Sequence, residues 1–117
     1  MSLRSNVAKR KGGIICVSIR GSIDVEGSVA LEKELAGILA AATKALILDM
    51  GGIDYIGSVG IRVIMTAKKK VEDAGGAFMV TGLQPNVKNV FDILHLIPLV
   101  NIFGSVREAE EGLAERQ

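Results

Sequence analysis

Two patterns of apolar residues alternate along this chain: short continuous runs and longer sets with helical spacing. The runs over 14–20, 45–48, 77–81 and 99–103 predict strands, because they are short and rich in apolar and β-branched residues. Residues 45–48 are apolar at every position, which is typical of a strand buried on both faces of a parallel sheet. The runs therefore predict a mostly parallel sheet.

The helically spaced sets predict four helices between and after these strands. One covers roughly 26–42, with Asp24 as its N-cap. A second starts at Ser58, and the ordinary role of a serine at a helix start is that of N-cap. A third begins at Pro85, a residue that suits the first helical position, and a fourth begins with a capping box at Ser105.

The segments before the first two helices complete the predicted topology. Gly21 and Ser22 break or bend the first strand, and Ile23 starts a second short strand, so that the two form a hairpin-like pair. Residues 53–56 are expected to be a short extended link. Strands and helices alternate after the pair, which implies right-handed crossovers. We therefore expect an α/β fold with a mixed, mostly parallel sheet of four to five strands and about four helices, in a single domain over 1–117.

Composition narrows the class of protein. The chain has 117 residues, of which 49% are hydrophobic and 3% aromatic, with no tryptophan, so the core is aliphatic. It carries 14 basic and 13 acidic residues, for a net charge of +1. Such a balance offers no electrostatic reason to bind a nucleic-acid backbone, and the scarcity of aromatic residues argues against base stacking. We expect no nucleic-acid partner.

Three features of the sequence favour a cytoplasmic location. Cys16 is the only cysteine, which fits a reducing compartment. The basic residues near the N-terminus lead into a strand-like run and not into the apolar region of a signal peptide. No apolar stretch reaches the roughly 18 residues that a membrane span needs. We expect no direct membrane insertion.

Residues for enzyme chemistry are scarce. His95 is the only histidine, and at the end of an apolar helix it is interpreted as a cap or a partly buried structural residue. One cysteine and one histidine cannot supply a zinc site, and no phosphate-binding glycine loop is present. Asp24, Asp49 and Asp54 are interpreted as turn or cap residues. We therefore expect no enzyme activity, no cofactor and no metal.

The segment from Leu48 to Ile61 is the most informative part of the chain. A buried strand leads into a loop, and Ser58 follows at the start of the next helix. Helix N-termini have unpaired N–H groups and a partial positive charge, which would stabilise a phosphate on this serine. Gly57 lets a partner backbone approach closely, and Gly60 lets the helix pack tightly. Ser58 is therefore a candidate regulatory site as well as a candidate N-cap.

Three segments of the chain resemble the STAS domains of bacterial anti-sigma-factor antagonists. Residues 55–64, Tyr-Ile-Gly-Ser-Val-Gly-Ile-Arg-Val-Ile, resemble the family signature around its serine. Residues 20–24, Arg-Gly-Ser-Ile-Asp, resemble the family motif after the first strand, and residues 75–87 resemble its Gly-Gly to Leu-x-Pro-x-Val run. The segments occur in the family's order and span nearly the whole chain.

The resemblance implies a partner-switching function. Family members bind a serine-kinase-type anti-sigma factor while unphosphorylated, are released when it phosphorylates their serine with ATP, and are restored by a serine phosphatase. Ser58 matches the phosphorylated serine, and Asp24 matches an acidic residue near it. The implied partner-binding residues are Asp24, Gly57, Ser58, Val59, Gly60 and Arg62. Gly57 stands where many members have aspartate, and Val59 where serine, threonine or alanine is usual.

Two other functions remain open at this point. One is a STAS module that serves as a subunit of a lipid-transport ATPase complex or of a signalling scaffold, which the departure at Gly57 favours. The other is a small nucleotide-binding protein, as proposed for some family members, although the sequence has no phosphate loop for it.

Overall fold

The computed structural model describes residues 3–39 and 43–116 of the chain. These residues form one five-stranded sheet with helices on both faces and at one end. The elements in chain order are β1 (Arg4–Arg10), β2 (Ile14–Ile23), α1 (Val25–Ile38), β3 (Ala45–Ile56), α2 (Ser58–Asp73), β4 (Ala77–Thr81), α3 (Pro85–Ile93), the 3-10 helix η1 (Ile97–Leu99), β5 (Asn101–Phe103) and α4 (Val106–Arg116).

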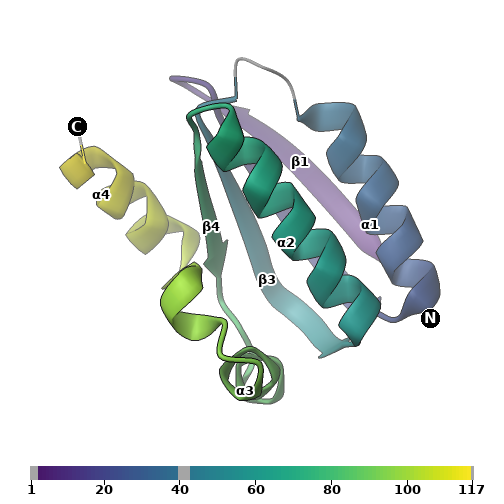
Figure 1. Ribbon diagram of the computed structural model, residues 1–117. Coiled ribbons are helices and arrows are strands. Elements are labelled where there is room, and N and C mark those ends of the chain that lie inside the picture. Colours follow the sequence, from purple (N-terminus) through teal and green to yellow (C-terminus); the bar gives the residue numbers. More distant parts are fainter. Residues whose placement is uncertain (1–2, 40–42, 117) are drawn as a thin grey trace.

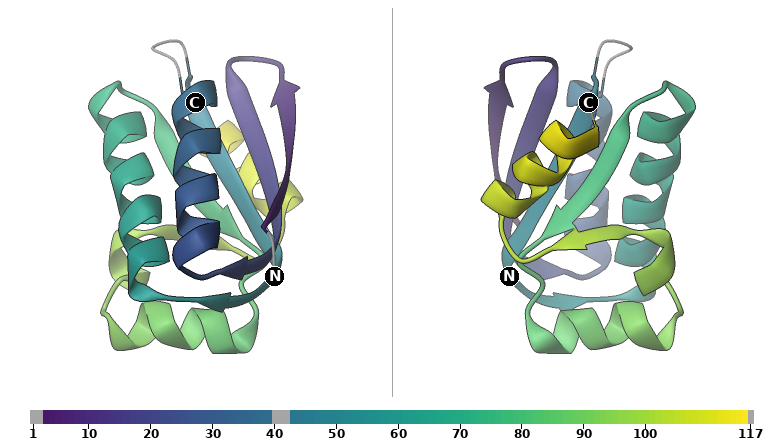
Figure 2. Two further views of the ribbon diagram at one scale, coloured as in Figure 1. Left: turned by 90° about the vertical axis from the view of Figure 1, so that its right-hand side faces the viewer. Right: turned by 90° about the vertical axis from the view of Figure 1, so that its left-hand side faces the viewer.

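The strands lie in the order β1-β2-β3-β4-β5. β1 is antiparallel to β2, and the other three pairs are parallel. Helices α1 and α2 lie side by side on one face, α4 lies on the opposite face, and α3 crosses the end of the sheet where the parallel strands finish (Figures 1 and 2). The structure confirms the predicted α/β fold, with a mixed, mostly parallel sheet and four α-helices.

The first hairpin differs from the prediction. Its strands are β1 and β2, joined by a turn in which Gly12 and Gly13 have positive φ angles of 80° and 77°. β2 continues through Gly21 to Ile23 as one strand, so no second strand starts there. The expectation missed β1 because it is a polar edge strand in which only Val7 is partly buried. An edge strand of this kind lacks the apolar pattern that marks a buried strand.

Three predicted boundaries also need correction. Residues 53–56 belong to β3 and not to a link, and two register shifts with β2 accommodate the extra length. α1 ends at Ile38, with Leu39 extended; the remainder of the predicted helix, residues 40–42, lies outside the described residues. The predicted strand over 99–103 is a 3-10 turn followed by the shorter β5. Among the helices that the structure describes, none is both long and apolar enough to cross a membrane.

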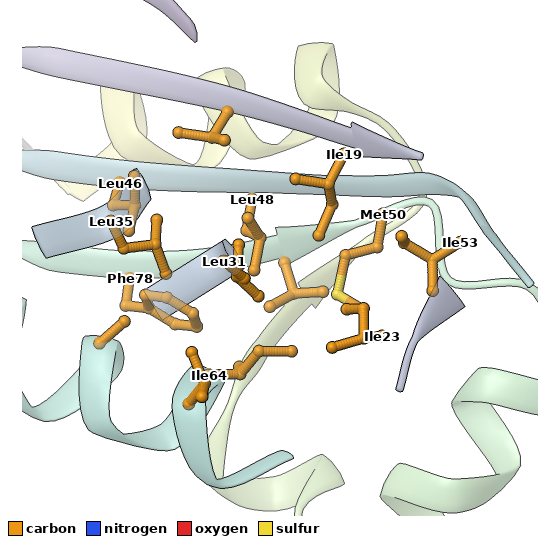
Figure 3. Packing of buried hydrophobic residues seen from close by; sticks show 14 of the residues in the cluster. Ile19, Ile23, Leu31, Leu35, Leu46, Leu48, Met50, Ile53, Ile64 and Phe78 are labelled. Carbon is orange, nitrogen blue, oxygen red and sulfur yellow. The ribbon is translucent and has the colours of Figure 1, made fainter. Parts of the chain in front are cut away.

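Two apolar clusters hold the sheet between its helices. The larger lies under α1 and α2 and includes Leu46 and Leu48 with residues of both helices (Figure 3). The smaller lies under α4 and includes Ile47 and Met79. Because neighbouring residues of β3 are buried in different clusters, the prediction that residues 45–48 form a strand buried on both faces is confirmed.

The predicted start of α4 is also confirmed. The Glu108 amide donates to Ser105 Oγ at 3.2 Å, as expected for a capping box. The Glu108 carboxylate accepts from the Gly104 amide at 2.9 Å, one residue before the usual position. Local signals thus place this helix correctly, while the carboxylate closes the turn one residue earlier.

Candidate functional site

Two strand-to-helix turns meet at the end of the sheet where the parallel strands finish. Ile23 and Ile56 are paired in the β2–β3 register, and the Gly57 amide donates to the Ile23 carbonyl oxygen at 3.0 Å. Because this bond links the two turns, α1 and α2 begin side by side at the same edge (Figure 2). The site is built on these two starts.

Ser58 is the first residue of α2, and its side chain is exposed. The N-cap is Gly57, with φ −99° and ψ 177°, and no side chain caps the helix. The expectation that Ser58 serves as N-cap is therefore wrong by one residue. The first turn also contains no acidic residue. In the described part of the chain, the Ser58 hydroxyl has no hydrogen-bond partner, so the start of α2 is open to an anion.

Asp24 lies at the neighbouring turn, as the sequence led us to expect, but its carboxylate is already engaged. It caps α1 and accepts a hydrogen bond from the Gly27 amide at 2.7 Å. The Ser28 hydroxyl donates to the Asp24 carbonyl oxygen, also at 2.7 Å. Asp24 thus has a structural role as the N-cap of α1, and a role in partner binding stays a prediction.

Gly60 brings α2 against the end of β2. A Cβ atom at Gly60 would lie 2.5 Å from Ile23 Cγ2 and 3.0 Å from Ile56 Cγ1. The buried glycine therefore permits a helix-to-strand approach that any larger residue would push apart. Gly57 has more room, because a Cβ there would meet only the Tyr55 ring within 3.7 Å, its hydroxyl oxygen being nearest at 3.3 Å.

A groove of about 200 Å³ lies between α1 and α2, next to the start of α2. Val59 and Arg62 contribute to it, so Val59 is half-buried at the groove and is not a core residue. Arg62 is exposed, and its guanidinium forms no ion pair within the described residues. The groove residues are Ser28, Val29, Glu32, Val59, Arg62, Val63 and Thr66.

The sequence interpretation missed three exposed apolar residues near the starts of the two helices. Val25 and Val29 of α1 are 68% and 49% exposed, and Tyr55 before α2 is 54% exposed. Val25 and Val29 are four residues apart, on one helix face and away from the buried Leu31 and Leu35. That spacing was the available signal, because apolar residues off the core stripe of a helix mark an exposed contact surface.

The other two aspartates, proposed as turn or cap residues, lie within β3, so that interpretation is wrong. Asp49 accepts from the Gly51 amide at 3.1 Å and from Ser18 Oγ at 3.3 Å. Asp54 accepts from Ser22 Oγ at 2.7 Å, and its carbonyl oxygen accepts from Asn86 Nδ2 at 2.6 Å. These bonds hold the end of β3 against β2 and α3. No group of three metal-ligating side chains occurs in the residues that the structure describes.

Cys16 and His95 lie outside the site. Cys16 is buried in the cluster under α4, and burial raises the pKa of its thiol, so it is a poor nucleophile. His95 has φ 58° and forms the turn that ends α3, where its amide donates to the Asp92 carbonyl oxygen at 3.0 Å. The C-cap of α3 is Leu94, so the interpretation of His95 as a cap is wrong by one residue, and its side chain is exposed and not partly buried.

Comparison with known proteins gives a consistent result. The STAS domain family model matches residues 6–109. The provisionally named anti-sigma factor antagonist BtrV of Bordetella bronchiseptica is 30% identical over 92 residues, which cover 76% of this chain and 79% of BtrV. The structure of an anti-sigma factor antagonist from Mycobacterium paratuberculosis has a TM-score of 0.84 at 23% identity, covering 94% of this chain and 92% of that one.

A second similar structure is that of Bacillus SpoIIAA, an anti-sigma factor antagonist. Its unphosphorylated form has a TM-score of 0.81 at 14% identity, covering 96% of this chain and 97% of SpoIIAA. Its phosphorylated form has a TM-score of 0.73, covering 94% and 99%. At these identities the solved structures establish the shared fold alone.

Proposed function

This chain belongs to the STAS domain family, and we propose that it is an anti-sigma-factor antagonist that works by partner switching. In its unphosphorylated form it binds a serine-kinase-type anti-sigma factor and so frees the sigma factor. Phosphorylation of Ser58 releases the complex, and a serine phosphatase restores the binding form. The chain itself is a regulator and not an enzyme, and its partners place it in the cytoplasm.

The observation that carries this proposal is the open start of α2. Ser58 is exposed at a helix N-terminus that no side chain caps. Beside it lie the groove and the exposed Val25 and Val29, which offer a partner apolar contact. The 30% identity with BtrV supports the same function.

The modification requires one phosphoryl transfer. Ser58 Oγ attacks the γ-phosphorus of ATP bound to the anti-sigma factor, the bond to the bridging oxygen breaks, and ADP leaves. The hydroxyl proton passes to a base of the kinase. The phosphoserine carries about −1.5 to −2 charge, and the free N–H groups of the first turn of α2 stabilise it. Gly57 has no side chain that could occupy those groups.

The phosphate would act at the interface without refolding the domain. A phosphate group buried against a partner without a cation costs several kcal/mol in lost hydration. Since each 1.4 kcal/mol changes affinity tenfold, one phosphate is sufficient to abolish a micromolar complex. The apolar groove remains unchanged, so removal of the phosphate restores binding.

The test compares charge at Ser58 with the same charge elsewhere. Ser58→Asp is expected to weaken binding to the anti-sigma kinase encoded beside this gene by at least about tenfold in isothermal titration calorimetry. Asn89→Asp adds the same charge on the exposed side of α3 and is expected to bind like wild type. Circular dichroism of both variants is expected to match wild type. Equal binding by Ser58→Asp and wild type would refute the switch.

A direct assay of the modification complements the binding test. Incubation with the kinase and ATP is expected to add one phosphate to wild type, located at Ser58 by mass spectrometry, and none to Ser58→Ala. Phosphorylation of another serine would contradict the assignment of the regulatory site to Ser58 at the start of α2.

The residue at position 57 favours a second candidate function. Gly57 stands where a carboxylate is usual next to the serine, so the usual kinase has lost one recognition feature. In that case the domain serves as a subunit of a lipid-transport ATPase complex or of a signalling scaffold. Affinity capture from the native extract separates the two: transporter subunits without a sigma regulator would support the second function and contradict the first.

A further inference from the structure

Basic residues are concentrated in β1, β2 and the turn between them, residues 4–23, which we call the basic hairpin. The basic hairpin contains five basic residues and no acidic residue, whereas residues 24–117 contain nine basic and thirteen acidic residues. The net charge of +1 is therefore the sum of a positively charged basic hairpin and a negatively charged segment over residues 24–117. The basic residues are Arg4, Lys9, Arg10, Lys11 and Arg20, and all five are exposed.

The fold neutralises one of these five charges. Arg10 Nη1 lies 3.1 Å from Glu110 Oε2 of α4. Among the described residues, no carboxylate pairs with the other four. The neighbouring acid on α1, Glu34, accepts a hydrogen bond from Ser5 Oγ at 2.9 Å. Three cations on two adjacent strands and Lys11 in the turn between them are thus exposed to water or available to a partner.

Two of the unpaired cations lie directly opposite each other. Arg4 and Arg20 are partners in the β1–β2 register, an arrangement in which like charges repel. The stem of Arg20 lies across Gly52 of β3, because a Cβ atom at Gly52 would be 2.7 Å from Arg20 Cγ. The glycine therefore leaves space for the arginine on this face. An acidic group placed beside Arg4 would offset this repulsion.

The outer edge of β1 is also free. β1 is the terminal strand of the sheet and, among the described strands, pairs only with β2, as Figure 2 shows. Alternate residues of this seven-residue strand therefore present outward-facing N–H and C=O groups without a strand partner in the described part of the chain. Such an edge accepts an extended peptide through main-chain hydrogen bonds.

We propose that the outer edge of β1 binds an acidic, extended segment of a partner protein, which adds to the sheet as a further strand. Carboxylates at alternate positions of that segment face the arginines, and its backbone bonds to β1. The site is at the sheet edge and uses none of the groups around Ser58, so it does not depend on the proposed function.

Two other occupants fit the surface less well. A membrane-surface site combines basic residues with apolar anchors, but the exposed large apolar residues lie outside the basic hairpin: Val25, Val29, Tyr55, Ile93, Leu94 and Leu99. A second copy of β1, paired antiparallel, would bring basic side chains against basic side chains. An acidic peptide supplies both the missing charges and the missing backbone partner.

The experiment uses a fluorescent peptide of about eight residues that alternates threonine and glutamate, a length that matches β1. Three matched probes accompany it. One replaces glutamate with glutamine. The other two are N-methylated on alternate residues, so that each lacks the N–H donors along one of the two edges of the extended peptide. Binding is measured by fluorescence anisotropy, and the position of the peptide by amide shifts of β1. Vesicles of phosphatidylcholine with about 30% phosphatidylserine test the lipid alternative.

The expected result is binding of the glutamate peptide with shifts along β1, and at least tenfold weaker binding of the glutamine peptide and of one N-methylated version. Arg4→Glu/Arg20→Glu is expected to lose at least tenfold in affinity, while Lys70→Glu/Lys88→Glu, with the same charge change on α2 and α3, is not. Arg4→Gln/Arg20→Gln, which removes the charges without reversing them, is expected to give an intermediate loss.

Several outcomes would overturn the proposal. One is that the glutamate peptide does not bind at millimolar concentration. Another is that the glutamine peptide, or both N-methylated versions, bind as tightly as the glutamate peptide. The last is that Arg4→Glu/Arg20→Glu and Lys70→Glu/Lys88→Glu lose affinity equally. Binding of the vesicles without binding of the peptide would assign the basic hairpin to a lipid surface instead. Because Ser58 is intact in every variant, none of these outcomes bears on partner switching.

Discussion

Helices α1 and α2 begin at neighbouring turns of similar sequence, but only one of the two starts is closed by a side chain. Both helices have a buried isoleucine before the cap and a buried glycine in the first turn. The matching positions are Ile23 and Ile56, Asp24 and Gly57, and Gly27 and Gly60. The difference is at the cap itself, where the carboxylate of Asp24 binds the Gly27 amide and Gly57 offers no side chain.

The comparison shows that a helix can be held in place by core packing even when no side chain caps its N-terminus. α2 buries six residues and α1 four, so packing holds α2 without a capping side chain. The unpaired N–H groups at its start are therefore available for another use. The exposed Ser58 lies at that start, whereas the corresponding residue of α1 is the apolar Val25.

The two glycines provide the strongest test of the packing that both starts share. A Cβ atom at Gly27 would collide with the Ser22 carbonyl oxygen, which is backbone, while at Gly60 it would press on the Ile23 side chain. We expect Gly27→Ala to lower the free energy of unfolding by about 2–3 kcal/mol and Gly60→Ala by about 1–2 kcal/mol. Urea unfolding followed by circular dichroism measures both. If neither variant loses stability, the helices do not depend on this close approach.

Asp24→Ala tests the closed start. The loss of the carboxylate leaves the Gly27 amide without its partner, so we expect a decrease of about 1 kcal/mol in the free energy of unfolding. Asp24→Asn keeps a side-chain oxygen at the cap and is expected to lose less than half of that. An equal loss in both variants would mean that the charge of Asp24, and not its hydrogen bond, stabilises α1.

Gly57→Asp gives the open start the cap that α1 has. The backbone at Gly57 is extended, so any residue fits its φ and ψ, and the nearest contact of the new Cβ is the exposed Tyr55 ring. We expect a gain of about 0.5 kcal/mol in the free energy of unfolding, measured in the same urea titration. A loss would show that the Tyr55 ring cannot move and that position 57 requires glycine for space.

Ser58→Ala is the variant with the smallest expected effect. The hydroxyl is exposed and forms no hydrogen bond within the described residues, so the free energy of unfolding is expected to stay within about 0.5 kcal/mol of wild type. A decrease above about 1 kcal/mol would mean that the hydroxyl closes the start of α2, and the two helix starts would then be alike. Thermal unfolding provides an independent check.

Local patterns were sufficient wherever the deciding interaction is short-range. The helix starts at Pro85 and Ser105 follow from residues within one turn of each, and the buried strand at 45–48 follows from its continuous apolarity. β1 was missed because a polar edge strand is stabilised by pairing with β2 and not by its own pattern. Ser58 was correctly predicted to start α2, but it is not the N-cap, because its neighbour Gly57, bonded to Ile23 of the adjacent strand, takes that position.

The sequence by itself therefore determined the fold class, the order of most elements and the position of Ser58 at the start of a helix. Only the tertiary structure decided that the start of α2 is open beside a groove and that the basic residues of the hairpin form one edge. These two facts depend on which strands and helices become neighbours. Contacts between residues far apart in the chain cannot be predicted from the local sequence pattern of either segment.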